Sequence, residues 1–594
     1  MALLQVENLS VTYKNQSAGH EVVKRVSFHA EAGKITGIVG ESGCGKTTLM
    51  RALMGLLPAN AEVECDRILL GEKDIYGSQM EQVRGSQISM IFQEPSVYLD
   101  DALTIGRQIA DTVRAHNKCT VREARRRAEE LLDLVGFSPA GDFMKKYSFE
   151  LSGGMCQRAA IAMALACQPK LLIADEPTTA LDALVQGQIL GLLRRIVKET
   201  GTAILLVSHD LGVIASVCSR VLVMQQGEIV EEGQVEDVFY LPEHSYTKEL
   251  ISLSVRKRHA RFEREDGEWK NILELNHVTK TFGVQEAVKE VSLSIHEGEI
   301  FGLAGESGCG KTTLAKMVTG LIKPDAGQIL YDGNEVEVIG KWKKRRGQAG
   351  IQMVFQSPAS ALNPALTVRG MLEDALLASK EARKDEVDGQ VCRVLEQVGL
   401  KGEDADKYPH EFSGGQKQRL VLARALILRP RLLICDEPVS ALDISIQEQI
   451  LDLLTEVQNQ TKIAGLLISH DLDVIKYRSN RVGIMYQGHL VESGPTEEVC
   501  RLPWHPYTKV LLESVLTPDP FRARKRKPVS RIQSKLEGGQ NQCPFAPYCG
   551  YVRECCKRLR PQMYRFGERE VACFLYSQEQ GKLRSSGYIM GSQI

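Results

Sequence analysis

The residues with the clearest capacity for chemistry lie in two identical glycine-rich segments, each of which follows an apolar run and opens a predicted helix. Glycines let the backbone wrap closely around a phosphate, and inward-pointing N–H groups at a helix N-terminus favour a bound anion. A short pattern can arise once by accident, but this one occurs twice in the same context. The residues predicted to bind nucleotide are Gly40, Glu41, Ser42, Gly43, Cys44, Gly45, Lys46, Thr47 and Thr48, and Gly305, Glu306, Ser307, Gly308, Cys309, Gly310, Lys311, Thr312 and Thr313.

The lysine and the first threonine of each segment have distinct predicted roles. We expect Lys46 and Lys311 to reach the β- and γ-phosphates of a nucleotide, because an ammonium group neutralises charge there. We expect the hydroxyls of Thr47 and Thr312 to hold Mg²⁺. The sequence therefore predicts ATP and Mg²⁺ as cofactors at two sites.

Two Asp-Glu pairs follow apolar runs further along the chain. Asp175 and Asp436 each end a predicted strand, which would place a carboxylate near Mg²⁺. The adjacent Glu176 and Glu437 are candidates to polarise the water that attacks the γ-phosphate. A surface Asp-Glu pair at a strand end is common by itself, but here each pair follows a complete glycine-rich segment. We therefore predict a Mg²⁺ ligand and a catalytic carboxylate in each half.

Two glutamines and two histidines complete the predicted sites. Gln93 and Gln356 follow apolar runs and offer a neutral amide to Mg²⁺ or to the attacking water. His209 and His470 each follow a predicted strand and can donate a hydrogen bond to the γ-phosphate. A lone histidine is more often structural, but these two recur in register with the other parts of the site. We expect all four residues to contribute to catalysis.

A second kind of anion-binding helix start occurs in each half, as a Ser-Gly-Gly turn before a helical pattern. The turns consist of Ser152, Gly153, Gly154, Ser413, Gly414 and Gly415. With these turns the sequence resembles the ABC ATPase family, and the resemblance covers both halves end to end. It implies head-to-tail packing, in which the second turn closes over ATP on Lys46 and the first over ATP on Lys311. Two composite ATP sites are therefore expected.

The resemblance assigns further roles. It implies that Tyr13 and Phe282 stack on adenine, and that Asp182 and Asp443 communicate between the two sites. Met155 stands where glutamine is commoner in the family, so the two sites could turn over at unequal rates.

The later segments Asp175-Glu176-Pro177, Ser208-His209-Asp210 and Tyr246-Thr247 recur at one constant offset, as Asp436-Glu437-Pro438, Ser469-His470-Asp471 and Tyr507-Thr508. Such a repeat indicates duplication of one domain. We expect a first ATPase cassette at 1–253, a linker at 254–271 and a second cassette at 272–515. Residues 516–594 have no counterpart after the first cassette and form a small Cys-rich C-terminal extension. The predicted fold class is α/β, with two tandem P-loop ABC ATPase cassettes.

Each cassette should contain a parallel sheet with an inserted helical subdomain. Short apolar runs at Ile35–Val39, Leu171–Ala174 and Ala203–Val207 predict buried strands that alternate with helical patterns. Between Gln93 and Ser152 the pattern turns helical. These features predict a parallel sheet covered by helices on both faces, together with a mainly helical insertion.

Composition limits the other possibilities. The 594 residues include 74 Lys and Arg against 75 Asp and Glu, so no global charge favours nucleic acid as a partner. The first residues lack the pattern of a signal peptide, and no apolar run approaches the roughly 20 residues of a spanning helix. We therefore expect a chain that binds no nucleic acid and does not itself cross a membrane.

Five of the 15 cysteines lie near the C-terminus. In a chain without an export signal, such a cluster favours thiols or metal ligands over disulfides. The pattern of Cys543, Cys549, Cys556 and Cys573 resembles the C-terminal segment of dipeptide and oligopeptide importer ATPases, in which four thiolates can hold a [4Fe–4S] cluster. Cys555 is the spare cysteine in this alignment. A cluster, a zinc ion and unmetallated thiols remain the three alternatives.

The motifs resemble the peptide and nickel branch of ABC importers. That resemblance implies a fused ATP-binding subunit at the cytoplasmic face of the cell membrane, which powers import of peptides, nickel or related small solutes. Its partners would be two integral-membrane permeases, docked at the loops after Gln93 and Gln356, and through them a solute-binding protein. The alternative is a soluble, cytoplasmic tandem ABC ATPase that activates or remodels a metalloenzyme or another macromolecule. Neighbouring permease genes would favour import.

Overall fold

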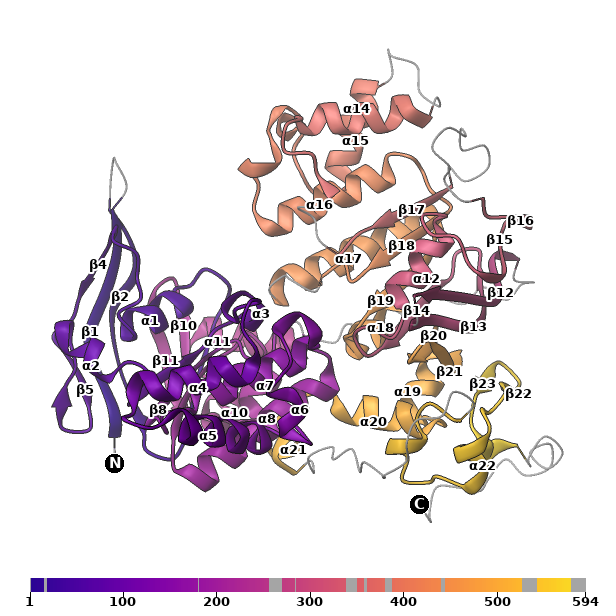
Figure 1. Ribbon diagram of the computed structural model, residues 1–594. Helices are drawn as coiled ribbons and strands as arrows, with labels where there is room; N and C mark the ends of the chain where they lie inside the picture. Colours follow the sequence, from indigo (N-terminus) through magenta and orange to yellow (C-terminus); the bar gives the residue numbers. More distant parts are fainter. Residues whose placement is uncertain are drawn as a thin grey trace. The chain divides into compact units, whose positions relative to one another are not determined.

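The protein is represented by a computed structural model (Figure 1). The structure describes residues 2–14, 19–179, 181–255, 270–283, 285–337, 350–356, 361–379, 387–439, 444–525 and 542–577. Contacts divide the chain into two compact units. Unit 1 consists of Met1–Leu181, Val185–Arg256 and Leu516–Val529, and unit 2 of Asp182–Leu184, Lys257–Val515 and Ser530–Ile594.

Unit 1 contains a six-stranded sheet in the order β11-β10-β3-β9-β8-β7. Its strands are β3 (Ile35–Val39), β7 (Ile88–Ile91), β8 (Leu171–Asp175), β9 (Ala203–Val207), β10 (Arg220–Gln225) and β11 (Glu228–Gln234). All neighbours are parallel except β10 and β11. The three strands predicted from apolar runs are β3, β8 and β9. They are buried along their whole length, as expected for parallel strands with both faces covered.

A second, antiparallel sheet of unit 1 packs over the first P-loop helix. It contains β1 (Ala2–Lys14), β2 (Gly19–Glu31), β4 (Ala61–Glu64), β5 (Arg67–Leu70) and β6 (Lys73–Asp74). The helix α1 (Lys46–Leu53) lies in the core that this sheet shares with β3, β8 and β9. Burial of Leu49 and Met50 in that core fixes the helix whose N-terminus faces the nucleotide site.

The predicted helical insertion of unit 1 packs against α7 (Gly153–Ala164). This helix begins at the first Ser-Gly-Gly turn; the two helices that follow these turns are called the signature helices, and the turns the signature turns. Its helices are α3 (Pro95–Tyr98), α4 (Ile105–His116), α5 (Val121–Leu134) and α6 (Ala140–Phe143). A capping box between Thr120 and Glu123 begins α5, and its apolar stripe is buried against α4 and α7. The remaining helices are α2 (Met80–Val83), α8 (Ala183–Thr200), α9 (Leu211–Val217), α10 (Val235–Tyr240) and α11 (Ser245–Val255).

Unit 2 repeats this plan with an extended core sheet, in the order β17-β18-β19-β14-β20-β21-β23-β22. Its strands are β14 (Ile300–Gly305), β17 (Ile351–Val354), β18 (Leu432–Asp436), β19 (Ala464–Ser469), β20 (Arg481–Tyr486), β21 (His489–Pro495), β22 (Tyr564–Phe566) and β23 (Arg569–Val571). The last two strands come from the C-terminal segment, so this segment continues the sheet of the second cassette. The antiparallel sheet contains β12 (Asn271–Phe282), β13 (Gln285–His296), β15 (Ala326–Tyr331) and β16 (Asn334–Glu335).

The helices of unit 2 form the same groups. In Figure 1, α14 and α15 lie together to one side of the core sheet, beside the signature helix α16. The helices are α12 (Lys311–Val318), α14 (Val368–Ser379), α15 (Val387–Gln397), α16 (Gly414–Leu426), α17 (Ile444–Thr461), α18 (Leu472–Arg478), α19 (Thr496–Arg501), α20 (Pro506–Ser514) and α22 (Glu554–Arg558).

A short segment that follows the second cassette in sequence belongs to unit 1. Its helix α21 (Pro520–Lys525) packs on α9 and α10. Ala523 is buried in the unit 1 core. Arg524 forms an ion pair with Glu236, and its Nη2 donates a hydrogen bond to the carbonyl of Cys218. The C-terminal residues are therefore divided between the two units.

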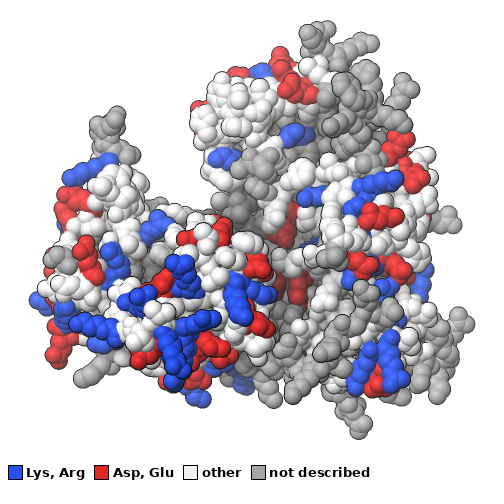
Figure 2. All heavy atoms as spheres, in the orientation of Figure 1, with Lys and Arg blue, Asp and Glu red and all other residues white. Residues whose placement is uncertain are grey.

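The surface carries charges of both signs. Figure 2 shows Lys and Arg interspersed with Asp and Glu over unit 1. On α4 and α5 this mixture includes the ion pairs Arg107–Asp111 and Arg126–Glu130. None of the helices in the described ranges has the length and apolar character required to span a bilayer.

Candidate nucleotide sites

The two glycine-rich segments form tight loops between a core strand and a helix. At Gly40 and Gly305 the backbone φ angles are 156° and 153°. A Cβ at these positions would lie 2.1 Å from the carbonyl oxygen of Met224 and 2.2 Å from that of Met485. Only glycine allows this close approach, which begins the loop at the end of the strand. The loops therefore have the strand–loop–helix context of a phosphate cradle.

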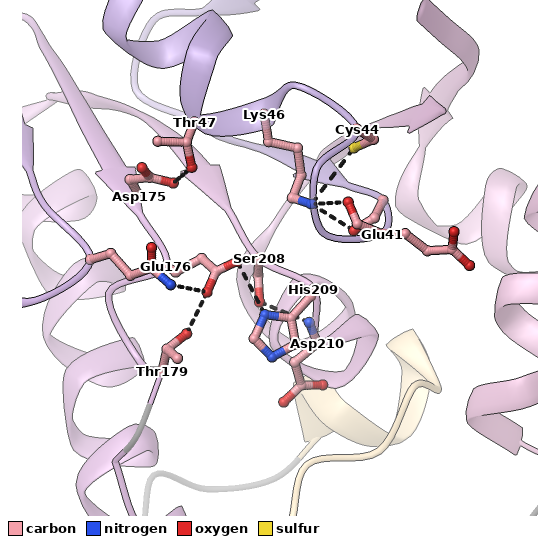
Figure 3. Close-up of polar contacts among 12 residues, drawn as sticks. Glu41, Cys44, Lys46, Thr47, Asp175, Glu176, Thr179, Ser208, His209 and Asp210 are labelled. Carbon is pink, nitrogen blue, oxygen red and sulfur yellow. Dashed lines mark hydrogen bonds and ion pairs between the residues drawn. The ribbon is translucent and has the colours of Figure 1, made fainter. Parts of the chain in front are cut away.

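The P-loop lysines lie across their own cradles. Lys46 Nζ donates to the carbonyls of Gly40 and Glu41, both at 2.7 Å, as Figure 3 shows. Lys311 Nζ makes the same bonds to Gly305 and Glu306, at 2.8 and 2.9 Å. Both lysines are 5% exposed. An ammonium group is thus held beside the backbone amides where a phosphate would bind.

A threonine hydroxyl and an aspartate carboxylate meet at each predicted Mg²⁺ position. Thr47 Oγ1 donates to Asp175 Oδ1 at 3.2 Å, and Thr312 Oγ1 donates to Asp436 Oδ1 at 3.1 Å. Burial raises the pKa of Asp175 to about 6 and also raises that of Asp436. A divalent cation would compensate this cost by stabilising the ionised carboxylates. The oxygen donors fit Mg²⁺, which keeps several waters and also binds substrate phosphates.

Glu176 lies at the centre of a hydrogen-bonded group in the first cassette (Figure 3). Its carboxylate accepts from Gln93 Nε2 at 3.0 Å and Thr179 Oγ1 at 2.9 Å, and lies 3.2 Å from His209 Nδ1. Burial opposes ionisation, but the bond to His209 and the neighbouring positive charges hold the pKa of Glu176 below its usual value. That bond also raises the pKa of His209. The carboxylate is therefore ionised and able to accept a proton or a hydrogen bond from water.

The second cassette reproduces this arrangement. Glu437 accepts from Gln356 Nε2 at 2.8 Å and lies 3.3 Å from His470 Nδ1. Burial raises the pKa of Glu437, but the bond to His470, the nearby positive charges and the bond to Gln356 together lower it below its usual value. Both glutamates have left-handed backbone angles, with φ of 46° at Glu176 and 49° at Glu437. Such a conformation is costly for a non-glycine residue, and strain of this kind clusters at functional sites.

The other predicted site residues lie outside these hydrogen-bonded groups. Tyr13, near the end of β1, is partly buried against the unit 1 core, whereas Phe282, at the end of β12, is 49% exposed. Asp182 is buried and is grouped with unit 2 by its contacts. Asp443 lies outside the described residues, as do residues 357–360 of the loop after Gln356.

The two signature turns differ in how their helices begin. Ser413 Oγ accepts a hydrogen bond from Gln416 N, and Gln416 Oε1 accepts one from Ser413 N, which forms a capping box. Ser152 makes no side-chain cap to α7, and Met155 has no side-chain amide for the second bond of a capping box. The hydroxyl of Ser152 is thus free of the capping bond that engages Ser413. The two signature turns therefore begin their helices in different ways.

Three kinds of residue around the sites were not predicted. Thr179 donates to Glu176, as described above, and Ser208 Oγ accepts from Asp210 N on the far side of His209. The hydroxyls of Tyr246 and Tyr507 accept bonds from the P-loop amides of Glu41 and Glu306. The signal for Ser208 and the two tyrosines was the recurrence of the Ser-His-Asp and Tyr-Thr segments at the constant offset.

The four predicted cysteine ligands of the C-terminal segment line one cavity. Cys543, Cys549, Cys556 and Cys573 surround it together with Phe545 and other residues. Cys543 N donates to the carbonyl of Cys556 at 2.9 Å, which ties two of the four positions together. Within the described ranges, no three His, Cys, Asp or Glu side chains are grouped closely enough to bind one metal ion.

Comparison with known proteins identifies the class. The ABC transporter family matches residues 23–179 and 288–440. The glutathione import ATP-binding protein GsiA of Pectobacterium atrosepticum is 38% identical over 590 residues, covering 92% of this chain and 95% of the relative. GsiA of Escherichia coli (strain K12) is 38% identical over 570 residues, covering 88% and 91%. The chain therefore belongs to the ABC transporter family and is an ABC-type ATPase with two cassettes.

A further match concerns the end of the second cassette. Residues 491–556 match the family described as oligopeptide/dipeptide transporter, C-terminal region, which places the chain in that branch. Among solved structures, CbiO1 of Clostridium perfringens, described as part of the ABC transporter complex CbiONQ, is 28% identical. It covers 39% of this chain and 91% of its own length, with a TM-score of 0.35. The assignment rests on the sequence matches.

Proposed function

We propose that this chain is the fused ATP-binding subunit that powers an importer of short peptides. The observation that carries the proposal is the match over nearly the whole chain to ATP-binding proteins named for glutathione import. The C-terminal match to oligopeptide and dipeptide transporters supports the same solute class. Because the named relatives import a tripeptide, a peptide is favoured over nickel.

The partners follow from this role. Two integral-membrane permeases would dock at the loops after Gln93 and Gln356, and a solute-binding protein would deliver solute to them. The chain would sit peripherally on the cytoplasmic face of the membrane. Gln93 and Gln356 each bond the catalytic glutamate of their cassette, so a permease that moves these loops would also move a catalytic group.

Each ATP would be enclosed by both cassettes. Ser413-Gly414-Gly415 would close over ATP on Lys46, and Ser152-Gly153-Gly154 over ATP on Lys311. Within unit 2, α16 packs on β17, α14, α15 and α17, whereas α12 packs on β13, β14 and β18. The two anion-binding helix starts of one cassette thus have different packing partners, which favours their use on different nucleotides.

Each residue of a site would have a separate role in ATP hydrolysis. Lys46 and Lys311 would turn from their carbonyl partners to the phosphates. Mg²⁺, held by Thr47 and Asp175 in the first site, would neutralise charge on the β- and γ-phosphates. Glu176 would orient and polarise water, and His209 would donate to the γ-phosphate. Closing of the cassettes on ATP and their reopening after hydrolysis would switch the permeases between outward and inward access.

The experiment for this function is co-purification from native membranes in mild detergent. Recovery of two polytopic membrane proteins with the chain, and ATPase stimulation by a peptide-loaded binding protein, are the expected results. Recovery of a soluble metalloenzyme instead, with no membrane protein, would support the alternative activator role and contradict import.

We propose that the four C-terminal cysteines hold an iron–sulfur cluster rather than a single metal ion. In a [4Fe–4S] site each thiolate binds a different iron, so the sulfurs lie farther apart than around one zinc ion. Here the four thiols line one cavity although no three are close enough for one ion. Burial raises the pKa of Cys573 to about 12 and that of Cys543 to about 11, so cationic iron would be needed to keep them as thiolates.

Anaerobic purification should therefore give a brown protein with about four irons per chain, by the stoichiometry of a four-thiolate cluster. Cys549→Ser should lose most of the iron, because it removes a cavity ligand. Cys555→Ser, which changes the neighbouring spare cysteine, should retain it. Iron and zinc are measured by elemental analysis. Zinc in place of iron, or metal-free protein with intact ATP binding, would reject the cluster.

A further inference from the structure

Each P-loop is tied at its start to a buried tyrosine. Tyr246 Oη accepts from Glu41 N at 3.0 Å, and Tyr507 Oη accepts from Glu306 N at 3.1 Å. An amide that donates to tyrosine cannot donate to phosphate, so the bond fixes the start of the loop and leaves the later amides for the nucleotide. Neither tyrosine belongs to the predicted catalytic set.

In the second cassette, the C-terminal segment packs around this tyrosine. The Phe545 ring lies 5.5 Å from that of Tyr507 in an edge contact and 5.4 Å from that of Tyr486. The Tyr486 and Tyr507 rings are 4.5 Å apart. All three side chains are at most 2% exposed. In so dense a cluster, the position of the Tyr507 hydroxyl depends on Phe545.

The turn before Tyr507 is held by a second contact from the same segment. His505 Nδ1 accepts from Tyr507 N at 3.0 Å, and full burial lowers the pKa of His505 to about 3, so the ring stays neutral. Glu492 accepts from His505 N at 2.9 Å and from Arg569 Nη2 at 2.7 Å. Arg569 comes from β23, and both charged groups are buried. Removing Arg569 would leave a buried carboxylate without this partner.

The first cassette provides an internal comparison. Glu231 accepts from Glu243 N and His244 N, and the Tyr246 ring occupies the place of Tyr507. Gln225 ends β10 where Tyr486 ends β20. Phe545 and Arg569 have no counterpart after the first cassette, because the C-terminal segment follows only the second.

We propose that Tyr507 is a positioning residue for the second nucleotide site, and that Phe545 and Arg569 hold it in place. Residues 542–577 then support ATP binding at the Lys311 site and not at the Lys46 site. Tyr507 positions the loop through its hydrogen bond to the amide of Glu306, and this effect does not depend on which solute is transported.

The test measures nucleotide affinity at one site at a time in the full chain. Lys46→Met weakens the first site, so that binding reports on the second, and Lys311→Met does the reverse. Affinity is measured by equilibrium binding of a fluorescent ATP analogue with Mg²⁺. Loss of one hydrogen bond or of the ring that places it should weaken binding about 5- to 10-fold. Tyr507→Phe and Phe545→Ala should do so at the second site, with first-site affinity within about twofold of the parent.

Matched variants sharpen the result. Tyr246→Phe should weaken only the first site, and Phe545→Leu should restore most of the second-site affinity lost in Phe545→Ala. With both lysines present, Phe545→Ala should raise KM for ATP more than it lowers kcat. Unchanged second-site binding in Tyr507→Phe, or equal weakening of both sites by Phe545→Ala, would overturn the proposal. Should Phe545→Ala fold poorly, Tyr507→Phe still decides, because it removes one oxygen atom.

Discussion

Replacing Glu176 and Glu437 together by Gln will abolish steady-state ATP hydrolysis while ATP binding is retained. Each carboxylate is ionised, partly buried and held by a glutamine amide and a histidine at about 3 Å. Glutamine has the same shape but cannot accept a proton, so the loss should be on the order of 10²- to 10⁴-fold, the usual contribution of a general base. The phosphate contacts of the P-loops are untouched.

Phosphate release and binding of labelled ATP, measured on the same preparation, check this result. Surface carboxylates provide the control: Glu62→Gln and Glu286→Gln remove exposed partners of Lys14 and Lys289 and should leave turnover unchanged. Hydrolysis near the wild-type rate in the Glu176→Gln, Glu437→Gln protein would refute the assignment of these carboxylates.

Replacing Lys46 and Lys311 together by Met will remove high-affinity ATP binding. Both ammonium groups are buried beside the amides of the phosphate cradle, where the low dielectric strengthens a charge-assisted bond to phosphate. Loss of about 1.5–3 kcal/mol per site corresponds to roughly 10- to 150-fold weaker binding. Methionine keeps the length of the side chain, so α1 and α12 should stay folded.

Equilibrium binding of a fluorescent ATP analogue, with thermal unfolding as a check of the fold, measures this effect. Lys24→Met and Lys289→Met occupy equivalent surface positions in the two cassettes and serve as matched controls. Binding that is unchanged in the Lys46→Met, Lys311→Met protein would mean that nucleotide does not use these cradles.

Local patterns in the sequence were sufficient to predict the core strands and the polar residues that lie at their ends. Apolar runs predicted β3, β8 and β9, because parallel strands are buried on both faces. The carboxylate at the end of β8 and the hydroxyl in the first turn of α1 were both predicted to bind Mg²⁺, and in the structure Thr47 Oγ1 donates to Asp175 Oδ1. These relations follow from strand order and from the fixed geometry of a P-loop.

Features that depend on long-range packing could not be predicted from the sequence. The hydrogen bond from Glu41 N to Tyr246 Oη joins residues far apart in sequence, and the types of these two residues do not predict that they meet. Nor did composition indicate that α21 packs on the first unit while β22 and β23 extend the sheet of the second. Short segments with weak periodicity are placed by tertiary contacts rather than by local propensity.

The central claim is that each nucleotide is bound by the P-loop of one cassette and the serine-led helix start of the other. The most direct measurement is an experimental structure of the Glu176→Gln, Glu437→Gln protein with ATP and Mg²⁺. The account predicts two ATP molecules, one contacting Lys46 and Ser413 and the other contacting Lys311 and Ser152. ATP enclosed by the P-loop and the Ser-Gly-Gly turn of a single cassette would contradict it.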